Sequence, residues 1–223
     1  MSATLISPNF NERDGVTVDM LVLHYTGMKS AAEALARMCD PTAEVSAHYM
    51  IDEDGTLTHL VDEQMRAWHA GVAMWRGFSN INSRSIGIEL VNPGHEFGYR
   101  DFPDAQMQTL ITLCQGVLAR HDIPARNVVA HADVAPSRKQ DPGERFDWAR
   151  LAAHGIGLWP SADHVPAPVP DSDAMPLLSE IGYDCSDPNA AVIAFQRHFC
   201  PARIDGDLDR ETRRAIAGVH TPI

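Results

Sequence analysis

The stretch Val16–Tyr25 reads VTVDMLVLHY, and its β-branched and apolar residues predict a buried strand. The Ala- and Leu-rich stretch Ser30–Met38 follows shortly after and predicts a helix. Strand signals that alternate with helix signals are typical of an α/β fold, in which helices flank a sheet.

The same alternation continues along the chain. Ala47–Ile51 and Thr56–Leu60 flank the turn residues DEDG, which predicts a hairpin. Ser85–Val91 (SIGIELV) predicts a further buried strand, and Asn127–His131 (NVVAH) predicts a short strand that ends on a histidine. Between them, Asp104–His121 carries apolar residues at the spacing of a long amphipathic helix.

The composition changes at residues 160–176, where five prolines occur in 17 residues. Proline fixes φ and lacks a backbone donor, so no helix or central strand is expected there. A semi-rigid linker at 160–176 would separate an α/β domain at 1–159 from a small C-terminal part at 177–223. That last part has two amphipathic helix patterns, Asn189–Phe199 and Asp209–Val219, and predicts a compact helical binding module.

Composition argues against several classes of protein. The net charge of −12 argues against a sequence-independent nucleic-acid-binding protein, which needs a basic face. The four cysteines form no C-x-x-C pair, so no zinc ribbon is expected. No run approaches the length of a transmembrane helix, so no membrane insertion is expected. The N-terminus lacks the features of a secretory signal, which favours the cytoplasm.

Two histidines and one aspartate have the features of a metal site. His24 (VLHYT) and His131 (VVAHADVAP) each end an expected strand, where a side chain can emerge from the sheet edge. Asp141 (SRKQDPG) follows on a polar loop. Two imidazoles and one carboxylate fit a catalytic zinc site that leaves the fourth position for water. The alternative is that both histidines are buried strand-end residues with satisfied hydrogen bonds, because eleven histidines offer many accidental pairings.

Six motifs occur in a specific order: VLHYT, VSAHYMIDEDG, AWHAG, SIGIELVNPG, VVAHADVAPSRKQDPG and FDW. Over residues 15–160 this order resembles the zinc-dependent N-acetylmuramoyl-L-alanine amidases of the AmpD/AmiD type, in the amidase_2 and peptidoglycan recognition superfamily. The resemblance implies a mixed central β-sheet flanked by helices. It also implies hydrolysis of the amide bond between N-acetylmuramic acid, or its 1,6-anhydro form, and L-alanine of the stem peptide.

The C-terminal stretch, AVIAFQRHF followed by IDGDLDRETRRAI, resembles the small all-α, three-helix peptidoglycan-binding domain that is often appended to such enzymes. The expected partners are therefore peptidoglycan or (anhydro)muropeptides. The sequence identifies no protein partner. A wall-binding module would favour the periplasm or cell envelope, which is the alternative to the cytoplasm.

The resemblance also assigns roles to residues. It makes His24, His131 and Asp141 the ligands of a Zn²⁺ cofactor. It makes Glu89, inside the apolar strand SIGIELV, the group that orients and deprotonates the attacking water, and it makes Lys139 a donor to the developing oxyanion. Without the resemblance, Glu89 could be a solvent-facing edge residue, although a carboxylate in an apolar strand is costly to bury. Lys139 could be a solvated loop charge.

Further expectations concern the substrate groove. Trp68 and His69 (AWHAG) are expected to border it, and Tyr25 and Asn92 to contact substrate. The alternatives are core positions for Trp68 and Tyr25, and a turn-forming role for Asn92. His48 is expected to be structural or to support the metal ligands.

Two other polar residues have ordinary structural expectations. Asp133 is expected to cap a turn, and His198, like most of the remaining histidines, is expected on the surface or in a loop. The rival to an enzyme is a non-catalytic peptidoglycan or muropeptide recognition protein, which keeps the fold without the metal. The complete ligand set, together with Glu89 and Lys139, argues against that rival.

Overall fold

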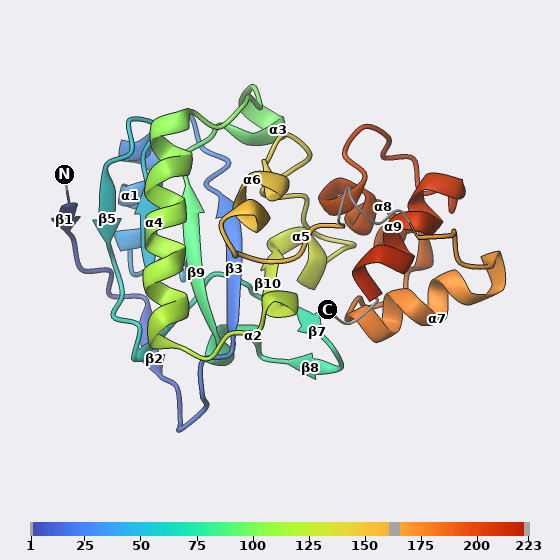
Figure 1. Cartoon of the computed structure of the whole chain (residues 1–223). Helices are drawn as coiled ribbons and strands as arrows, with labels where there is room; N and C mark the ends of the chain where they lie inside the picture. Colours follow the sequence, from blue (N-terminus) through green and yellow to red (C-terminus); the bar gives the residue numbers. More distant parts are fainter. Residues whose placement is uncertain (1, 161–165, 221–223) are drawn as a thin grey trace.

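A mixed six-stranded sheet lies at the centre of the part that the structure, a computed structural model, describes, namely residues 2–160 and 166–220 (Figure 1). The strand order is β1-β5-β4-β9-β3-β10, and β4 pairs with β5 antiparallel whereas the other neighbours are parallel. The strands are β1 (Ser2–Thr4), β3 (Met20–Tyr25), β4 (Tyr49–Ile51), β5 (Leu57–His59), β9 (Ser85–Leu90) and β10 (Val128–Ala130). The expected mixed α/β sheet is therefore confirmed.

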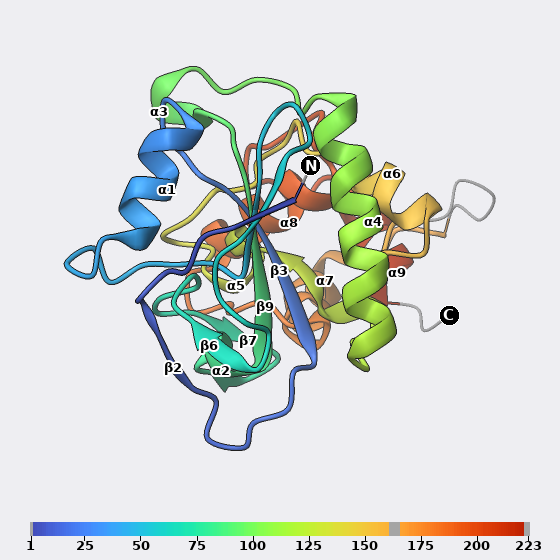
Figure 2. The ribbon, with the colours of Figure 1, turned by 90° about the vertical axis from the view of Figure 1, so that its left-hand side faces the viewer.

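Helices α1 (Ala31–Cys39) and α4 (Asp104–Arg120) lie on opposite sides of this sheet, as Figure 2 shows. Helix α4 shares a buried apolar core with Leu21 and Leu23 of β3. Side chains alternate between the two faces of a strand, so His24 projects from the face opposite α4.

Shorter elements connect and flank the main sheet. β2 (Phe10–Glu12) pairs with β6 (Met65–Ala67), and β7 (Met74–Trp75) pairs with β8 (Phe78–Ser79). The short helical elements are α2 (Ile81–Arg84), α3 (Gly94–Phe97), the 3-10 helix η1 (Ala125–Asn127), α5 (His131–Val134) and α6 (Trp148–Ala153). Elements this short carry too few residues for a periodic signal, so the sequence did not predict them. No helix among the described residues combines the length and apolar character needed to span a bilayer.

Helix α7 (Asp171–Ile181) begins inside the stretch that was expected to be a linker. The prediction that no helix forms over 160–176 is therefore wrong for residues 171–176. Residues 161–165 of that stretch lie outside the described residues.

Packing and end effects explain why α7 tolerates a proline. Pro176 lies inside the helix and removes one backbone donor. Ala174 and Leu178 are completely buried, so apolar burial offsets that loss. Asp171 and Asp173 lie in the first turn, where a negative charge interacts favourably with the helix dipole.

The C-terminal helices α7, α8 (Pro188–Phe199) and α9 (Arg210–His220) lie beside α5 (Figure 1). They belong to one buried cluster with Met20 and Val22 of β3. The C-terminal helices therefore continue the core on the face of the sheet from which His24 projects.

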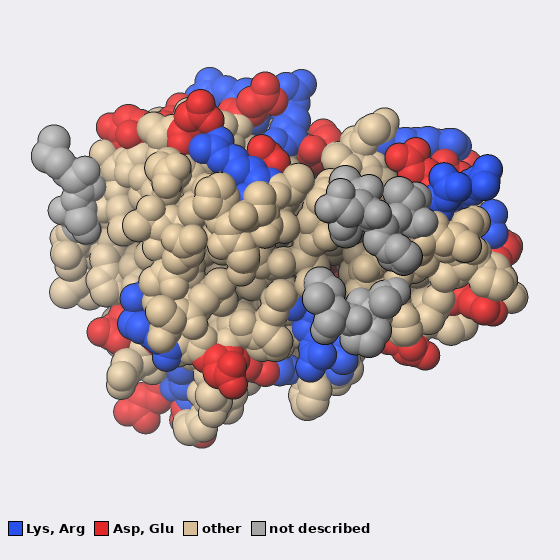
Figure 3. Space-filling view, viewed as in Figure 1, with Lys and Arg blue, Asp and Glu red and all other residues tan. Residues whose placement is uncertain are grey.

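Charged side chains are mixed on the face of the molecule shown in Figure 3. Lys and Arg atoms alternate with Asp and Glu atoms along its upper edge and its right-hand end, and its middle is mainly uncharged. No broad basic patch covers the described residues on this face.

Candidate metal centre

Three side chains converge where β3 and β10 end. His24 Nδ1 lies 2.9 Å from His131 Nδ1 and 3.1 Å from Asp141 Oδ2, and the last two atoms are 3.0 Å apart. All three side chains are buried, with exposed fractions of 1%, 3% and 6%. The structure thus brings together the three residues that the sequence predicted as ligands.

Strand register explains this convergence. β3 and β10 are parallel, and Leu23 pairs with Ala130. The next residue on β3 is His24. The expected strand 127–131 ends one residue early, at Ala130, so the residue after β10 is His131, which begins α5; the two imidazoles therefore lie level with each other. Asp141 returns to the same place because Ala132 N–H donates a hydrogen bond of 2.9 Å to the Asp141 carbonyl.

A chain of hydrogen bonds determines which nitrogen of His24 carries the proton. Ser85 Oγ donates to the Ile81 carbonyl at 2.7 Å, so it accepts from His69 Nε2 at 3.1 Å. His69 Nδ1 must then accept from His24 Nε2–H at 3.0 Å. Burial, reinforced by His24, lowers the pKa of His69 well below its ordinary value, which keeps this acceptor neutral. His24 therefore presents a lone pair at Nδ1.

The space for His69 comes from a glycine in the strand SIGIELV. A Cβ on Gly87 would lie 2.4 Å from the His69 Cγ atom, so a larger residue at this position would displace the ring. His69 is 5% exposed and lies behind His24 rather than at the edge of a groove. From the sequence, His69 was expected at the groove, and this buried position was missed. The sequence signal that could have indicated a close approach of another side chain is the glycine inside an apolar strand.

The second imidazole is oriented in the same way. His131 Nε2 lies 3.0 Å from the Ala70 carbonyl oxygen, which can only accept a hydrogen bond. His131 Nε2 therefore donates, and in the neutral ring Nδ1 holds the lone pair. Arg138 donates to the same carbonyl at 3.1 Å and helps to hold it in place.

This arrangement fits a metal ion. Lone pairs of two nitrogens and one carboxylate oxygen face one another at about 3 Å, which is repulsive unless a cation lies among them. In a tetrahedral zinc site with bonds of about 2.0–2.1 Å, neighbouring nitrogen and oxygen ligands are about 3.3 Å apart. The donor set and spacing of His24, His131 and Asp141 suit such an ion.

The pKa values of the ligands agree with metal binding. Burial and the neighbouring His131 lower the pKa of His24 to about 4, so its imidazole is neutral near pH 7. Burial by itself would raise the pKa of Asp141, but the two adjacent imidazoles outweigh it and hold that pKa below its ordinary value. A metal competes with protons for such groups, and here few protons compete near neutral pH.

Glu89 lies next to His24 because the parallel register pairs these two residues across β3 and β9. Its Oε2 atom is buried and has no hydrogen-bond partner among the described residues. Burial, with Asp141 next, raises the pKa of Glu89 well above its ordinary value, whereas Lys139 acts to lower it. A carboxylate with an unused buried oxygen at this place can accept a proton from a reacting group.

Lys139 lies in the exposed loop between His131 and Asp141, and its backbone N–H donates to the Ala135 carbonyl at 3.0 Å. Its charge lowers the pKa of both Glu89 and His24, which indicates that its ammonium lies within electrostatic range of them. Lys139 is therefore an exposed cation close enough to the ligand cluster to act on a charge that develops there.

Tyr25 lies at the rim of the ligand cluster. Its hydroxyl donates to His95 Nδ1 at 2.8 Å, and His95 Nε2 donates to Glu144 at 3.1 Å. Burial and the Asp141 charge raise the pKa of Tyr25 to about 12, so its hydroxyl stays protonated. Tyr25 is half-buried, so one edge of it is available to substrate.

Trp68 and Asn92 do not join the ligand cluster. The indole N–H of Trp68 donates to Asn11 Oδ1 at 2.7 Å on a partly exposed surface. Asn92 is completely buried; its Oδ1 accepts from Gly94 N–H at 3.1 Å and its amide donates to the Arg100 carbonyl at 2.8 Å. Asn92 thus forms the turn after β9, which was the alternative for this residue.

Three of the other predictions also have clear outcomes. His48 is structural: it is completely buried, and its Nδ1 accepts from Gly87 N–H at 2.9 Å. Asp133 caps a turn, since its Oδ2 accepts from Ala130 N–H at 2.8 Å. The expectation of a surface position for His198 is wrong, because its ring is 3% exposed and stacks on Trp148 at a centroid distance of 3.8 Å.

Comparisons with known proteins agree with this geometry. Residues 14–144 match the family described as N-acetylmuramoyl-L-alanine amidase. The chain is 39% identical over 227 residues to the N-acetylmuramoyl-L-alanine amidase AmiD of Escherichia coli strain K12, an alignment that covers 90% of this chain and 81% of AmiD. It is 40% identical over 109 residues to the 1,6-anhydro-N-acetylmuramyl-L-alanine amidase AmpD of Enterobacter cloacae, covering 49% of this chain and 56% of AmpD.

Solved structures give the same result over the whole fold. The Escherichia coli AmiD complex with anhydro-N-acetylmuramic acid-L-Ala-D-γ-Glu-L-Lys matches with a TM-score of 0.82 at 35% identity, covering 95% of this chain and 96% of that one. AmpDh3 of Pseudomonas aeruginosa, in complex with an anhydromuramic pentapeptide, matches with a TM-score of 0.79 at 32% identity, covering 95% and 93%. These matches extend over the C-terminal helices as well as the sheet.

Proposed function

The chain belongs to the N-acetylmuramoyl-L-alanine amidase family, and from this premise we propose that it uses a zinc ion held by His24, His131 and Asp141. The reaction is hydrolysis of the amide bond between (anhydro-)N-acetylmuramic acid and L-alanine of the stem peptide, and the protein binds (anhydro)muropeptides. The observation that carries the zinc proposal is the convergence of three lone pairs within 3.1 Å.

The residues around the ligands divide the remaining work. A bound zinc ion supplies a Lewis acid, which polarises the scissile carbonyl and lowers the pKa of water. Glu89 accepts the proton of the attacking water through its free Oε2 and returns it to the nitrogen of L-alanine as the carbon–nitrogen bond breaks. The Lys139 ammonium stabilises the negative charge that develops on the carbonyl oxygen.

The remaining candidate residues act on orientation and binding. His69 fixes the tautomer and direction of the His24 ring through the hydrogen bond between them, as residues behind metal ligands commonly do. Tyr25, at the rim, contacts substrate. Trp68, with its indole on a partly exposed surface, borders a more distant part of the groove.

The C-terminal helices support a second proposal, which concerns their role and the location of the protein. Residues 177–223 resemble a peptidoglycan-binding domain, so we assign them a wall-binding role in addition to their packing on the domain at 1–159. Work on soluble anhydromuropeptides would suit the cytoplasm, and work on intact wall would suit the periplasm or envelope. Turnover of anhydromuropeptides compared with turnover of intact sacculi separates the two.

The proposal is tested on the purified full chain. We expect about one zinc per chain by elemental analysis, and release of L-alanyl peptide from an anhydromuropeptide by mass spectrometry. Dialysis against a chelator abolishes turnover, and added zinc restores it. A zinc-loaded sample that binds muropeptide and leaves the lactyl amide intact would instead identify a non-catalytic recognition protein.

A further inference from the structure

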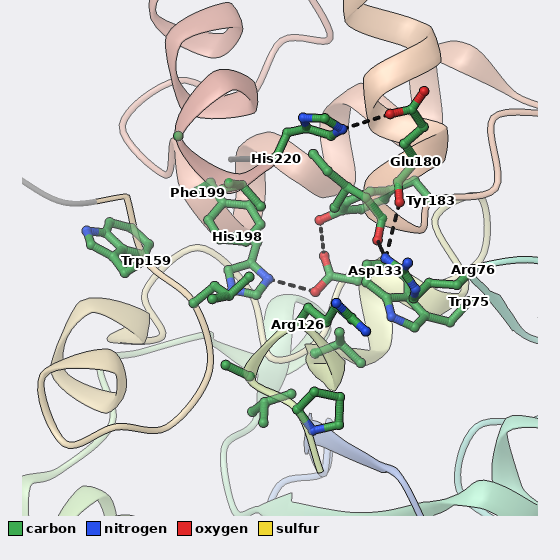
Figure 4. Close-up of a pocket in the computed structure, with 18 residues that line it drawn as sticks. Trp75, Arg76, Arg126, Asp133, Trp159, Glu180, Tyr183, His198, Phe199 and His220 are labelled. Atoms are coloured by element: carbon green, nitrogen blue, oxygen red, sulfur yellow. Dashed lines mark hydrogen bonds and ion pairs between the residues drawn. The ribbon is translucent and has the colours of Figure 1, made fainter. Parts of the chain in front are cut away.

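A second buried carboxylate lies two residues after the ligand His131, on the same short helix α5. Asp133 is completely buried and accepts three hydrogen bonds. Its Oδ2 accepts from Ala130 N–H at 2.8 Å. Oδ2 also accepts from His198 Nδ1 at 2.7 Å, and Oδ1 accepts from the Tyr183 hydroxyl at 2.7 Å, as Figure 4 shows. Two of these three donors belong to the C-terminal helical part of the chain.

Both C-terminal donors are held in place by aromatic neighbours. The His198 ring stacks between Trp148 and Phe199, with a centroid distance of 3.8 Å to each. The Tyr183 ring meets Trp75 edge-on at 5.2 Å. Because these two rings are packed in place, their donor atoms cannot move with Asp133. They therefore hold the Asp133 carboxylate in one position.

The energetic role of these donors follows from burial. Burying a carboxylate costs free energy unless its oxygens accept hydrogen bonds. The Tyr183 hydroxyl donates the hydrogen bond that Asp133 Oδ1 accepts. Burial and the Asp133 charge raise the pKa of Tyr183 well above its ordinary value, so this hydroxyl remains a donor. Without Tyr183 and His198, Asp133 would gain by turning towards solvent.

A turn of Asp133 would disturb the ligand. Its Oδ2 holds the Ala130 amide, and Ala130 is the residue immediately before His131. The His131 imidazole reaches the other ligands only while this turn is fixed, because His131 Nε2 must also meet the Ala70 carbonyl.

Arg197, the residue before His198 on helix α8, makes a further contact with a segment that carries a ligand. The Arg197 guanidinium lies 3.8 Å from Glu144, which follows the ligand Asp141 by three residues. Consecutive residues of α8 thus contact the segments that carry two of the ligands.

We propose that Tyr183 and His198 are positioning residues of the metal centre, which act through Asp133 to hold His131 in its ligand geometry. This inference rests on the proposed zinc amidase function. It gives the C-terminal helices a role in zinc affinity and turnover that is independent of wall binding.

Asp133, Tyr183 and His198 do not belong to the ligand cluster. They lie on the wall of a separate cavity of about 730 Å³ between α5 and the C-terminal helices (Figure 4), and none of the ligands lines that cavity. The hydrogen bonds to Asp133 are the contacts by which Tyr183 and His198 reach the turn that carries His131.

The test is the double variant Tyr183→Phe/His198→Phe, in which both rings keep their packing and lose their donors to Asp133. We expect the zinc dissociation constant, measured by competition with a chelating dye, to rise about tenfold or more. The visible spectrum of the cobalt-substituted protein should change, because the ligand geometry changes. With zinc limiting, kcat should fall while KM stays within about twofold.

A matched control is available within the same part of the chain. His220 Nε2 pairs with Glu180 at 2.7 Å, the same distance as the His198–Asp133 pair, and lines the same cavity, but the two side chains are exposed and their hydrogen bond does not involve Asp133. His220→Phe should leave zinc affinity and the cobalt spectrum unchanged. Leu178→Ala, in the buried face of α7, should lower the thermal midpoint without changing zinc affinity.

The outcomes separate the two claims. If the wild type binds zinc and turns over but the double variant keeps wild-type zinc affinity and cobalt spectrum, only the positioning role is overturned. If the wild type binds no zinc, the proposed function and this inference both fail. Should the double variant not fold, Tyr183→Phe alone decides, with an expected rise of about threefold in the zinc dissociation constant for one lost hydrogen bond.

Discussion

The molecule contains two buried clusters of histidine and aspartate only a few residues apart, and they are built in opposite ways. In the first, His24, His131 and Asp141 turn lone pairs towards one point, and the ring N–H groups point outward to His69 and the Ala70 carbonyl. In the second, both Asp133 oxygens already accept hydrogen bonds. The first cluster has the geometry that we propose for a zinc site, whereas both oxygens of Asp133 already have donors and need no cation.

The largest expected effect comes from removing a ligand of the first cluster. Asp141→Ala leaves two imidazoles, so zinc is lost and turnover falls by far more than about a hundredfold, the upper range for residues behind the ligands. Zinc content by elemental analysis and peptide release measure this. Asp101→Ala, an 83% exposed carboxylate, is the control and should behave like the wild type. Full zinc content in Asp141→Ala would show that the cluster of His24, His131 and Asp141 is not the zinc site.

The next effect separates metal binding from proton transfer. Glu89→Gln keeps the size of the side chain and leaves the ligands in place, so zinc content should stay at the wild-type level. Turnover should fall about 10²- to 10⁴-fold, because the proton acceptor is lost. Glu53→Gln, in a partly exposed pair with Arg100, is the control. Wild-type turnover of Glu89→Gln would remove Glu89 from the mechanism.

A smaller effect is expected from the residue behind His24. His69→Ala should raise the zinc dissociation constant about 10- to 100-fold, because the His24 ring loses the acceptor that fixes its tautomer. His48→Ala is a matched control, since His48 is equally buried but has no hydrogen bond to a ligand. Both variants should lose stability. If they lose zinc affinity equally, the His24–His69 bond has no special role.

The smallest effect is expected at Glu63, whose carboxylate pairs with His121 away from both clusters. This pair shows what an ordinary histidine–carboxylate contact contributes to stability. Burial would raise the pKa of Glu63, but hydrogen bonds from Arg120, Tyr49 and His121 outweigh it and lower that pKa to about 2 from 4.5. A lowered folded-state pKa means that this stabilisation is present above pH 4.5 and is lost as the pH falls towards 2.

Glu63→Gln should therefore cost about 1 kcal/mol of unfolding free energy near pH 7, a value reduced by solvent screening. The loss should shrink as the pH falls from about 4.5 to 2, and zinc content should not change. Urea unfolding at several pH values measures this. A stability loss that does not vary with pH in this range would contradict the assignment.

The sequence predicted the parts of the fold that have long local patterns. The strand around Glu89 and the helix at 104–121 have enough residues for a clear period and were found close to their expected bounds. The strand that carries His24 was also found, but it begins at Met20, four residues later than predicted. The resemblance carried by the six ordered motifs predicted His24, His131 and Asp141 as ligands; the structure brings these three side chains together, and their role as zinc ligands stays a proposal. Helix α7 was missed, since prolines suggested a linker and only tertiary burial reveals the helix.

The contacts of His69, Asp133 and His198 could not be predicted from local sequence patterns. His69 meets His24 across 45 residues, and His198 meets Asp133 across 65, so no local spacing relates them. A histidine on an amphipathic helix normally faces solvent, and His198 is buried only because another segment covers it. Such contacts depend on how the layers pack, which a single sequence does not show.

The parallel pairing of β3 with β9 has a consequence for folding itself. It places Glu89 opposite His24, and a slip of one residue would put Ile88 or Leu90 there and turn the carboxylate to the other face. The same slip would put a side chain in the place of Gly87, where a Cβ would lie 2.4 Å from the His69 Cγ atom, so the ring behind His24 would also be displaced. One alignment of two strands therefore places both the proton acceptor and the support of His24. A chain that folds with the wrong alignment would lose both together.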